Sequence, residues 1–289
     1  MEQGIIVKGT GGFYDVLTDQ GKIVTCRLRG RLRLEDERVL VGDRVKITCS
    51  DREGVVEEVL PRSNALIRPP IANVDQVMVV AAAAQPDPIP LLFDRILVHV
   101  EKAGLKAFIV INKVDLAPDA AEELKEYYQT AGYPVLLASA AQGRGLEEVR
   151  ECLKGRITTL AGPSGVGKSS LINALAPGFS LETGDISEKL RRGRHTTRTV
   201  SLLALPWGGL IADTPGFSRL EMIDIEVEDL QYMFPEFEPY HSECQFRGCL
   251  HRHEPNCRVK EAVADGAIAR QRYEHYLLFL DEVEENKPY

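Results

Sequence analysis

Long apolar runs alternate with amphipathic stretches between about residue 74 and residue 217. The apolar runs predict buried strands at residues 76–84, 106–112, 133–139 and 156–162 and just before residue 213. Apolar positions at helical spacing predict helices at residues 91–104, 119–132 and 145–155. Strands that are apolar throughout, separated by amphipathic helices, are typical of a parallel sheet covered on both faces. This region is therefore expected to have an α/β fold.

The N-terminal region has a different pattern, in which short β-rich runs are bounded by Gly or Asp turns. Strands are predicted at residues 4–10, 13–18, 22–28, 43–50 and 54–60. Five short strands within about 60 residues favour a small β-barrel, with an OB-fold as the best fit and an SH3-like barrel as the alternative. The following segments "LPRSN" and "RPP" are typical of a linker.

The alternation of strands and helices stops after "LIADTPGF", residues 210–217. Residues 223–289 contain acidic turns, a group of Cys and His residues, and a closing amphipathic helix predicted at residues 267–286. This last region is expected to be mainly α-helical.

Composition narrows the class of protein. The chain has 289 residues, 44% of them hydrophobic and 27% charged, as in globular proteins that dissolve in water. No apolar run approaches the ~18 residues of a membrane span, and the start lacks the pattern of a signal peptide. We therefore expect a cytoplasmic protein with no membrane association, in which disulfides among the six cysteines are not expected.

The net charge of −8 argues against indiscriminate nucleic-acid binding by the whole surface. Basic residues are nevertheless clustered in "CRLRGRLRL", residues 26–34, and in "EKLRRGRHTTR", residues 188–198. Each cluster is either a solvated face or a local site for phosphate groups. Arg29, Arg31 and Arg33 of the first cluster are candidates for RNA contact.

A phosphate-binding loop is predicted at residues 162–169, which fit G-x-x-x-x-G-K-[ST] between a strand and a helix. Its glycines allow backbone N–H groups to curl around phosphates, and the following helix directs its positive end toward them. Lys168 would reach the terminal phosphates, and the Ser169 hydroxyl would ligate Mg²⁺.

The tetrapeptide "DTPG", residues 213–216, follows an apolar strand and reads as a second phosphate-sensing element. Asp213 would hold Mg²⁺ through water, and the Gly216 N–H would meet the γ-phosphate. Such a tetrapeptide alone is often only a turn, but its place after a strand and after the phosphate loop favours function.

A guanine-recognition motif is predicted at "NKVD", residues 112–115, also at a strand end. The Asp115 carboxylate can accept hydrogen bonds from both guanine N1–H and the 2-amino group, a donor pair that adenine lacks. Lys113 can lie along the base, and the backbone at Ser139-Ala140 can donate to guanine O6.

These elements occur in an unusual order: base reader first, then phosphate loop, then "DTPG". In the usual order, a GTPase domain begins with the phosphate-loop strand and ends with the helix after the Ser-Ala element. Those two ends lie close together, as domain termini often do. Here residues 145–155 lead directly into residues 156–162 and join them, so the sequence predicts a circularly permuted GTPase.

A metal site is predicted at Cys244, Cys249 and Cys257 with one histidine, either His251 or His253. Three thiolates and one imidazole suit tetrahedral Zn²⁺, and an iron–sulfur cluster is the weaker alternative. Four ligands within 14 residues leave little room for a core, so the metal must organise the segment. The remaining cysteines, Cys26, Cys49 and Cys152, lie in strand or helix patterns and are expected to be core thiols.

The chain resembles the ribosome small-subunit-dependent GTPase A family (RsgA/YjeQ) over essentially its full length. The resemblance rests on the permuted order of "NKVD", "GPSGVGKSS" and "DTPG", on "GRHTTR" between the last two, and on the Cys/His cluster. It implies an OB-fold RNA-binding domain at residues 1–66, a permuted GTPase domain at 67–222 and a mainly α zinc-binding domain at 223–289. It also favours His251 as the fourth zinc ligand.

The function implied by the resemblance is GTP hydrolysis coupled to late assembly of the small (30S) ribosomal subunit, with that subunit and its rRNA as partners. We expect a monomer that holds one Zn²⁺ and uses Mg²⁺ with GTP. The residues expected to bind GTP are Asn112, Lys113, Val114, Asp115, Ser139, Ala140, Gly162, Pro163, Ser164, Gly165, Val166, Gly167, Lys168, Ser169, Ser170 and Gly216.

The segment "GRHTTR", residues 193–198, is expected to be the first switch, in which Thr196 or Thr197 ligates Mg²⁺. Phe217 stands where many GTPases carry a glutamine that orients the attacking water. His195 is the candidate to take over that role beside Lys168, because imidazole can hold water or accept a proton near neutral pH. The alternative for His195 is a loop histidine that contacts RNA or solvent.

Two other classes of function fit parts of the pattern. One is an RNA-binding assembly factor for which GTP is a structural ligand, and Phe217 favours it for the isolated protein. The other is an ATP-using P-loop kinase, which "NKVD" and Ser139-Ala140 argue against.

Overall fold

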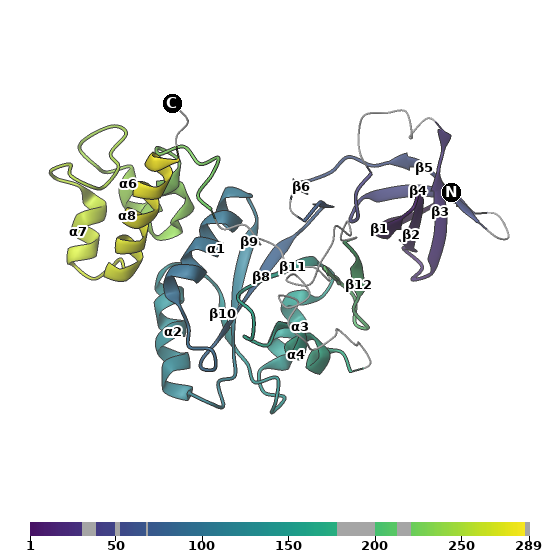
Figure 1. Ribbon diagram of the computed structural model, residues 1–289, viewed down its shortest axis with the longest axis horizontal. Coiled ribbons are helices and arrows are strands. Elements are labelled where there is room, and N and C mark those ends of the chain that lie inside the picture. Colours follow the sequence, from purple (N-terminus) through teal and green to yellow (C-terminus); the bar gives the residue numbers. More distant parts are fainter. Residues whose placement is uncertain (31–38, 50–52, 68, 178–199, 213–220, 287–289) are drawn as a thin grey trace. The chain divides into compact units, whose positions relative to one another are not determined.

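The computed structural model describes residues 1–30, 39–49, 53–67, 69–177, 200–212 and 221–286 (Figure 1). The chain forms two compact units. The first comprises residues 1–77 and 150–160 and the described part of 184–216. The second comprises residues 78–149 and the described parts of 161–183 and 217–289.

The N-terminal strands form a closed barrel in the order β1-β2-β3-β5-β4. The strands are β1 (Glu2–Thr10), β2 (Phe13–Thr18), β3 (Ile23–Leu28), β4 (Arg44–Cys49) and β5 (Gly54–Val59). Antiparallel pairing of β1 with β4 closes the barrel, while β3 and β5 pair in parallel. Alternate residues point inward and are fully or almost fully buried: Ile6, Val16, Cys26, Val45, Ile47 and Val56. This confirms the predicted barrel and its OB-fold order.

The segment expected to be a linker is instead packed and hydrogen-bonded. It forms a short hairpin of β6 (Ala65–Leu66) and β7 (Ile71–Ala72), and both residues of β7 are buried. Just before it, the Arg62 guanidinium binds both carboxylate oxygens of the fully buried Asp43, at 2.6 and 2.9 Å. Such pairings depend on residues distant in sequence, so "LPRSN" did not reveal them.

The α/β region contains a sheet in the order β10-β9-β8-β11-β13-β12. Its strands are β8 (Gln76–Ala82), β9 (Lys106–Asn112), β10 (Val135–Leu137), β11 (Ile157–Ala161), β12 (Leu202–Ala204) and β13 (Leu210–Ala212). Every residue of β8 and β11 is buried, including the polar residues Gln76, Thr158 and Thr159. β11, which enters the phosphate loop, lies beside β8, the first strand of this region, as the predicted permutation requires. The three-residue edge strand β12 was not predicted.

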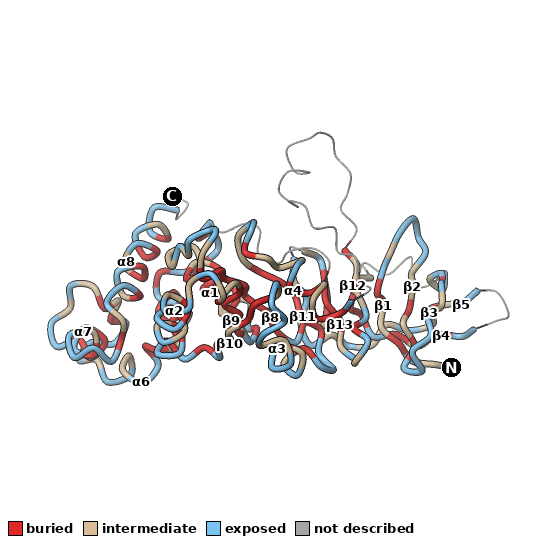
Figure 2. Tube along the Cα trace, turned by 90° about the horizontal axis from the view of Figure 1, so that it is seen from below, coloured by how far each residue is buried: buried red, intermediate tan, exposed pale blue. Residues whose placement is uncertain are grey.

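The helices of this region are α1 (Pro90–Lys102), α2 (Pro118–Thr130), α3 (Leu146–Leu153) and α4 (Lys168–Leu175). Helices α1, α2 and α3 each begin one residue away from the predicted start. Prolines open α1 and α2, at a position where the missing N–H of proline costs nothing. Buried residues gather on α1, β8 and β9 (Figure 2).

The C-terminal region is mainly helical, as expected. It contains the 3₁₀ turns η2 (Leu230–Met233) and η3 (Pro235–Phe237) and the helices α6 (Glu238–His241), α7 (Arg258–Ala264) and α8 (Arg270–Glu285). Its buried core includes Phe234, Phe237, Tyr276 and Phe279, and extends to Val98 of α1. The C-terminal helices therefore share a core with the first helix of the α/β region.

A buried charge cluster lies at the same junction. Arg272 of α8 is fully buried between Asp94 of α1, at 2.9 Å, and Glu236 of η3, at 2.6 Å. His275 contacts the second Asp94 oxygen at 2.6 Å. Burial opposes the charge of Arg272, but the two carboxylates outweigh it and raise its pKa well above the usual value.

Within the described part of the chain, no helix is long and apolar enough to cross a membrane.

Candidate functional site

The phosphate loop follows β11 and leads into α4, and close packing explains its glycines. Gly162 has φ +130°, and a Cβ there would lie 2.3 Å from the Val80 carbonyl oxygen. Gly167 precedes α4 with φ +93°, and a Cβ there would lie 2.4 Å from Asn112 Nδ2. Both positions exclude a side chain for reasons of space as well as conformation.

Lys168, the first residue of α4, turns its amine back over the loop. Its Nζ donates to the carbonyl oxygens of Gly162 and Pro163, at 2.8 and 2.6 Å. Ser169 follows it in the first turn of the helix. The loop thus brings an amine, a hydroxyl and a helix N-terminus together, which suits an anionic ligand.

The predicted base reader lies beside this loop, and Asn112 joins three segments. This buried residue ends β9, and its Nδ2 donates to the Val166 carbonyl at 3.0 Å. Its Oδ1 accepts the Ala140 backbone N–H at 3.1 Å. One amide side chain therefore ties the base reader to the phosphate loop and to the Ser-Ala element.

Lys113 makes a second link to the phosphate loop. Its backbone adopts the left-handed conformation, with φ +61°, and its Nζ donates to the Gly165 carbonyl at 2.8 Å. The same amine donates to the carbonyl of Gln85, after β8. The sequence did not point to Gln85, because a backbone acceptor leaves no mark on residue type.

Asp115 differs from its neighbours because one of its carboxylate oxygens has no hydrogen-bond donor among the described residues. Oδ1 is buried and receives no hydrogen bond within the described part of the chain. A buried carboxylate oxygen without a donor is costly, typically ~1–3 kcal/mol or more. A ligand with an N–H donor would remove that cost.

The Ser-Ala element forms a tight loop after β10. Buried Ser139 exchanges backbone hydrogen bonds with Arg144, at 3.0 and 3.1 Å, and its hydroxyl accepts the Gln142 N–H. The backbone N–H groups of Ser139 and Ala140 therefore already have acceptors, namely the Arg144 carbonyl and Asn112 Oδ1. A carbonyl ligand at Ala140 would compete with Asn112 for that donor.

Several predicted residues lie outside the described ranges: Arg31, Arg33, His195, Thr196, Thr197, Asp213 and Gly216. Arg29 is described. Its side chain is exposed, and its Nη1 pairs with Glu57 at 2.5 Å.

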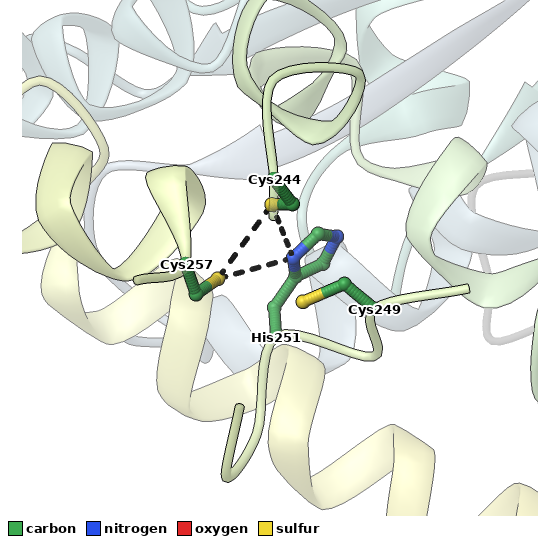
Figure 3. Close-up of side chains that lie close together, drawn as sticks. All are labelled: Cys244, Cys249, His251 and Cys257. Atoms are coloured by element: carbon green, nitrogen blue, oxygen red, sulfur yellow. Dashed lines mark hydrogen bonds between the residues drawn. The ribbon is translucent and has the colours of Figure 1, made fainter. Parts of the chain in front are cut away.

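Cys244, Cys249, His251 and Cys257 come together in the C-terminal region (Figure 3). Their ligand atoms all lie within 4.8 Å of one another. His251 Nδ1 lies 3.6 Å from Cys244 Sγ and 3.3 Å from Cys257 Sγ, and these sulfurs are 3.9 Å apart. Tetrahedral Zn²⁺ with Zn–S near 2.3 Å would place sulfurs about 3.8 Å apart. The donor set and its spacing fit zinc, and His253 is not part of the cluster.

The surroundings of the four side chains disfavour charged thiolates in the absence of an ion. Burial, with the neighbouring thiols, raises the pKa of Cys249 to about 12 and also raises that of Cys257. Burial lowers the pKa of His251 to about 4, so its imidazole is neutral. A divalent cation would offset the charge of thiolates here, as it does in structural zinc sites.

Residues outside the predicted motif hold the Cys/His loop in place. The Glu254 carboxylate accepts the backbone N–H groups of Leu250, Arg252 and His253. From α8, the hydroxyls of Tyr273 and Tyr276 donate to the carbonyls of His251 and Leu250, at 2.6 and 2.8 Å. Sequence spacing did not identify them, since α8 begins 13 residues after the last cysteine.

Known proteins are similar to this chain over nearly its full length. The family model described as RsgA GTPase matches residues 59–223, and the model described as RsgA N-terminal domain matches residues 3–56. A "Small ribosomal subunit biogenesis GTPase RsgA" of Moorella thermoacetica is 48% identical over 282 residues, covering 97% of each chain. One of the same name from Geobacillus thermodenitrificans is 49% identical, covering 100% of this chain and 99% of its own.

Solved structures are similar over the same length. The crystal structure of YjeQ from Thermotoga maritima matches with a TM-score of 0.88 and 41% identity, covering 99% of both chains. The structure of YloQ, described as a circularly permuted GTPase, matches with a TM-score of 0.85 and 42% identity, covering 100% of this chain and 97% of that one.

Proposed function

The chain belongs to the RsgA family of GTPases, and from this premise we propose that it acts in late assembly of the small (30S) ribosomal subunit. In this proposal it binds the subunit and its rRNA, hydrolyses GTP to GDP and phosphate, and is stimulated by the subunit. The names of its relatives support this role. We further propose that it works in the cytoplasm as a monomer, with domains at residues 1–66, 67–222 and 223–289.

The observation that supports guanine most directly is the buried Asp115 oxygen, which receives no hydrogen bond from any described residue. Guanine offers N1–H and a 2-amino group to such a carboxylate, whereas adenine offers neither. An adenine nucleotide would leave the oxygen buried and unpaired, which disfavours it by about 1–3 kcal/mol. Lys113, whose amine donates to the Gly165 carbonyl, is assigned to pack its alkyl chain along the base.

We assign phosphate binding to the loop of residues 162–169. On GTP binding, the Lys168 amine would exchange the carbonyls of Gly162 and Pro163 for phosphate oxygens. Ser169, Asp213 and either Thr196 or Thr197 are the residues that would hold Mg²⁺, directly or through water. When bound, Mg²⁺ neutralises charge on the phosphates.

Hydrolysis requires a water placed in line with the γ-phosphate. Phe217 cannot orient water, so we assign that task to His195. Binding of the small subunit would complete the catalytic site. GTP turnover should therefore be slow for the free protein and faster with small subunits; GTPases completed by a partner gain up to ~10⁵-fold.

Turnover measured with and without small subunits tests this proposal. His195→Ala should lower the stimulated rate and leave nucleotide binding unchanged. Equal rates with and without subunits would contradict the proposal, and an unchanged stimulated rate in the variant would remove His195 from the mechanism.

Subunit contact is assigned to Arg29, Arg31 and Arg33, of which Arg29 is described and is exposed. Co-sedimentation with small and large subunits, with GDP or a non-hydrolysable GTP analogue, measures this contact. Replacing Arg29, Arg31 and Arg33 by Glu should weaken binding to the small subunit. It should also flatten the salt dependence of binding, because fewer counterions are released. Equal affinity and equal salt slope would identify a solvated face.

We assign one Zn²⁺ to Cys244, Cys249, His251 and Cys257. The support is a set of three thiols and one neutral imidazole, all buried except the half-buried Cys244, spaced for tetrahedral coordination. With all four positions supplied by the protein, the ion has a structural role and leaves no site open for catalysis.

A further inference from the structure

Gln231 lies against the side of His251 that faces away from the three sulfurs. It belongs to η2, 20 residues before the histidine, and its side chain is buried. Its Oε1 lies 2.9 Å from His251 Nε2, while His251 Nδ1 faces Cys244 and Cys257 (Figure 3). The two nitrogens of one imidazole thus have separate partners.

The orientation of the Gln231 amide is determined by a second contact. Its Nε2 donates to the Glu228 carbonyl at 3.0 Å, so the oxygen of the amide, rather than its nitrogen, faces the histidine. A carbonyl oxygen can only accept, so His251 Nε2 must carry the proton. Nδ1 is then left with its lone pair directed at the sulfurs.

Burial and backbone conformation restrict the orientation of the His251 ring. His251 is fully buried and its backbone is in the left-handed conformation, with φ +59°. The Phe237 ring stands edge-on to the imidazole, with centroids 5.8 Å apart. Turning the ring over would place the carbons Cδ2 and Cε1 where Nδ1 and Nε2 now lie, so that neither the sulfurs nor Gln231 would face a ring nitrogen.

We propose that Gln231 is the positioning residue of the metal site, which selects the Nδ1-coordinating tautomer of His251 and strengthens its hold on the ion. Outer partners of metal-bound histidines typically contribute 10–100-fold in metal affinity. The inference rests on the proposed zinc site and adds a residue that lies outside the Cys/His motif.

The test uses the full-length protein and Zn²⁺ competed against a chromophoric chelator. Gln231→Leu keeps the size but removes the acceptor and should weaken Zn²⁺ affinity ~10–100-fold. Gln231→Glu restores an acceptor and should recover most of the affinity. Gln271→Leu, at an exposed position of α8, is the matched control and should bind like the unsubstituted protein.

A second measurement needs no variant. In protein loaded with ¹¹³Cd²⁺ and labelled with ¹⁵N-histidine, scalar coupling should join the metal to Nδ1 of His251, and Nε2 should carry a proton. Coupling to Nε2, or equal Zn²⁺ affinity of Gln231→Leu and the unsubstituted protein, would overturn the role of Gln231. Failure of the unsubstituted protein to bind Zn²⁺ would instead overturn the zinc site itself, and the role of Gln231 with it.

Discussion

The nucleotide loops and the Cys/His loop are both irregular segments, but different parts of the fold hold them. The phosphate loop and the base reader leave the ends of buried strands, β11 and β9. Asn112 and Lys113 then connect them through backbone carbonyls. Among the described residues, no strand leads into the Cys/His loop. Its support is Glu254, two tyrosine hydroxyls and the four ligand side chains themselves.

This difference implies different dependence on ligands. Loops that follow the ends of buried strands are stabilised by the sheet, so this site is expected to keep its shape without nucleotide. A loop whose buried groups are mostly metal ligands needs the ion as its core. The two sites are nevertheless linked, because α8 joins α1 through Arg272 and a shared apolar core.

Metal removal should have the largest effect. Structural zinc binds small modules with apparent free energies of ~10–16 kcal/mol, so its loss should unfold the Cys/His loop. After chelation, amide exchange across residues 244–257 should approach unfolded rates, while β8 and β9 keep their protection. Cys257→Ser should reproduce this. Cys49→Ser should not, because Cys49 lies outside the cluster and is exposed rather than a core thiol as the sequence predicted. Unchanged protection of the loop would mean that it stands without the ion.

Arg272→Met should be the next largest change, because it leaves Asp94 and Glu236 buried without their cation. Removing one partner of a buried ion pair typically costs ~3–5 kcal/mol in the free energy of unfolding. Urea denaturation would measure it, with exposed Arg270→Met as the matched control. A loss below ~1 kcal/mol would show that the charge cluster does not anchor the C-terminal helices to α1.

Asp115→Asn should affect the nucleotide site alone. Replacing an acceptor by an amide should weaken GTP binding by ~1–3 kcal/mol, or roughly 5–150-fold, and shift preference toward xanthine, whose 2-oxo group accepts. Competition titrations with guanine and xanthine nucleotides would measure the shift. Asp119→Asn, in the exposed first turn of α2, is the control. GTP affinity equal to that of the unsubstituted protein would remove Asp115 from base recognition.

The smallest effect is expected at Glu282, which holds the start of the C-terminal region. Its carboxylate pairs with Arg95 of α1 at 2.6 Å and accepts the Met222 N–H at 3.2 Å. Glu282→Gln should weaken this contact by ~1 kcal/mol and raise exchange of the Met222 amide roughly 5-fold. Glu285→Gln, exposed at the end of α8, serves as control. Equal exchange in both variants would indicate that the apolar burial of Met222 suffices.

Local patterns predicted the elements and the motifs well. β9 has the predicted bounds, α1 and α2 differ from prediction by one residue at the start, and the five barrel strands are confirmed. The reason is that strand burial, helix periodicity and turn residues act over a few neighbouring positions. The pattern did not predict β12, because this edge strand has three residues and only one of them is buried.

By itself, the sequence determined the permuted order of the motifs, the barrel, and the three cysteines of the metal cluster, since each depends on residue types at short spacing. Only the tertiary structure decided which histidine lies in the cluster, which groups hold Asn112 and Lys113, and that Arg272 and Gln231 matter. These depend on contacts between positions far apart in the chain, such as Arg272 with Asp94 and Gln231 with His251. A buried arginine or glutamine has the same sequence letter as an exposed one, and only packing reveals the partner that makes its burial tolerable.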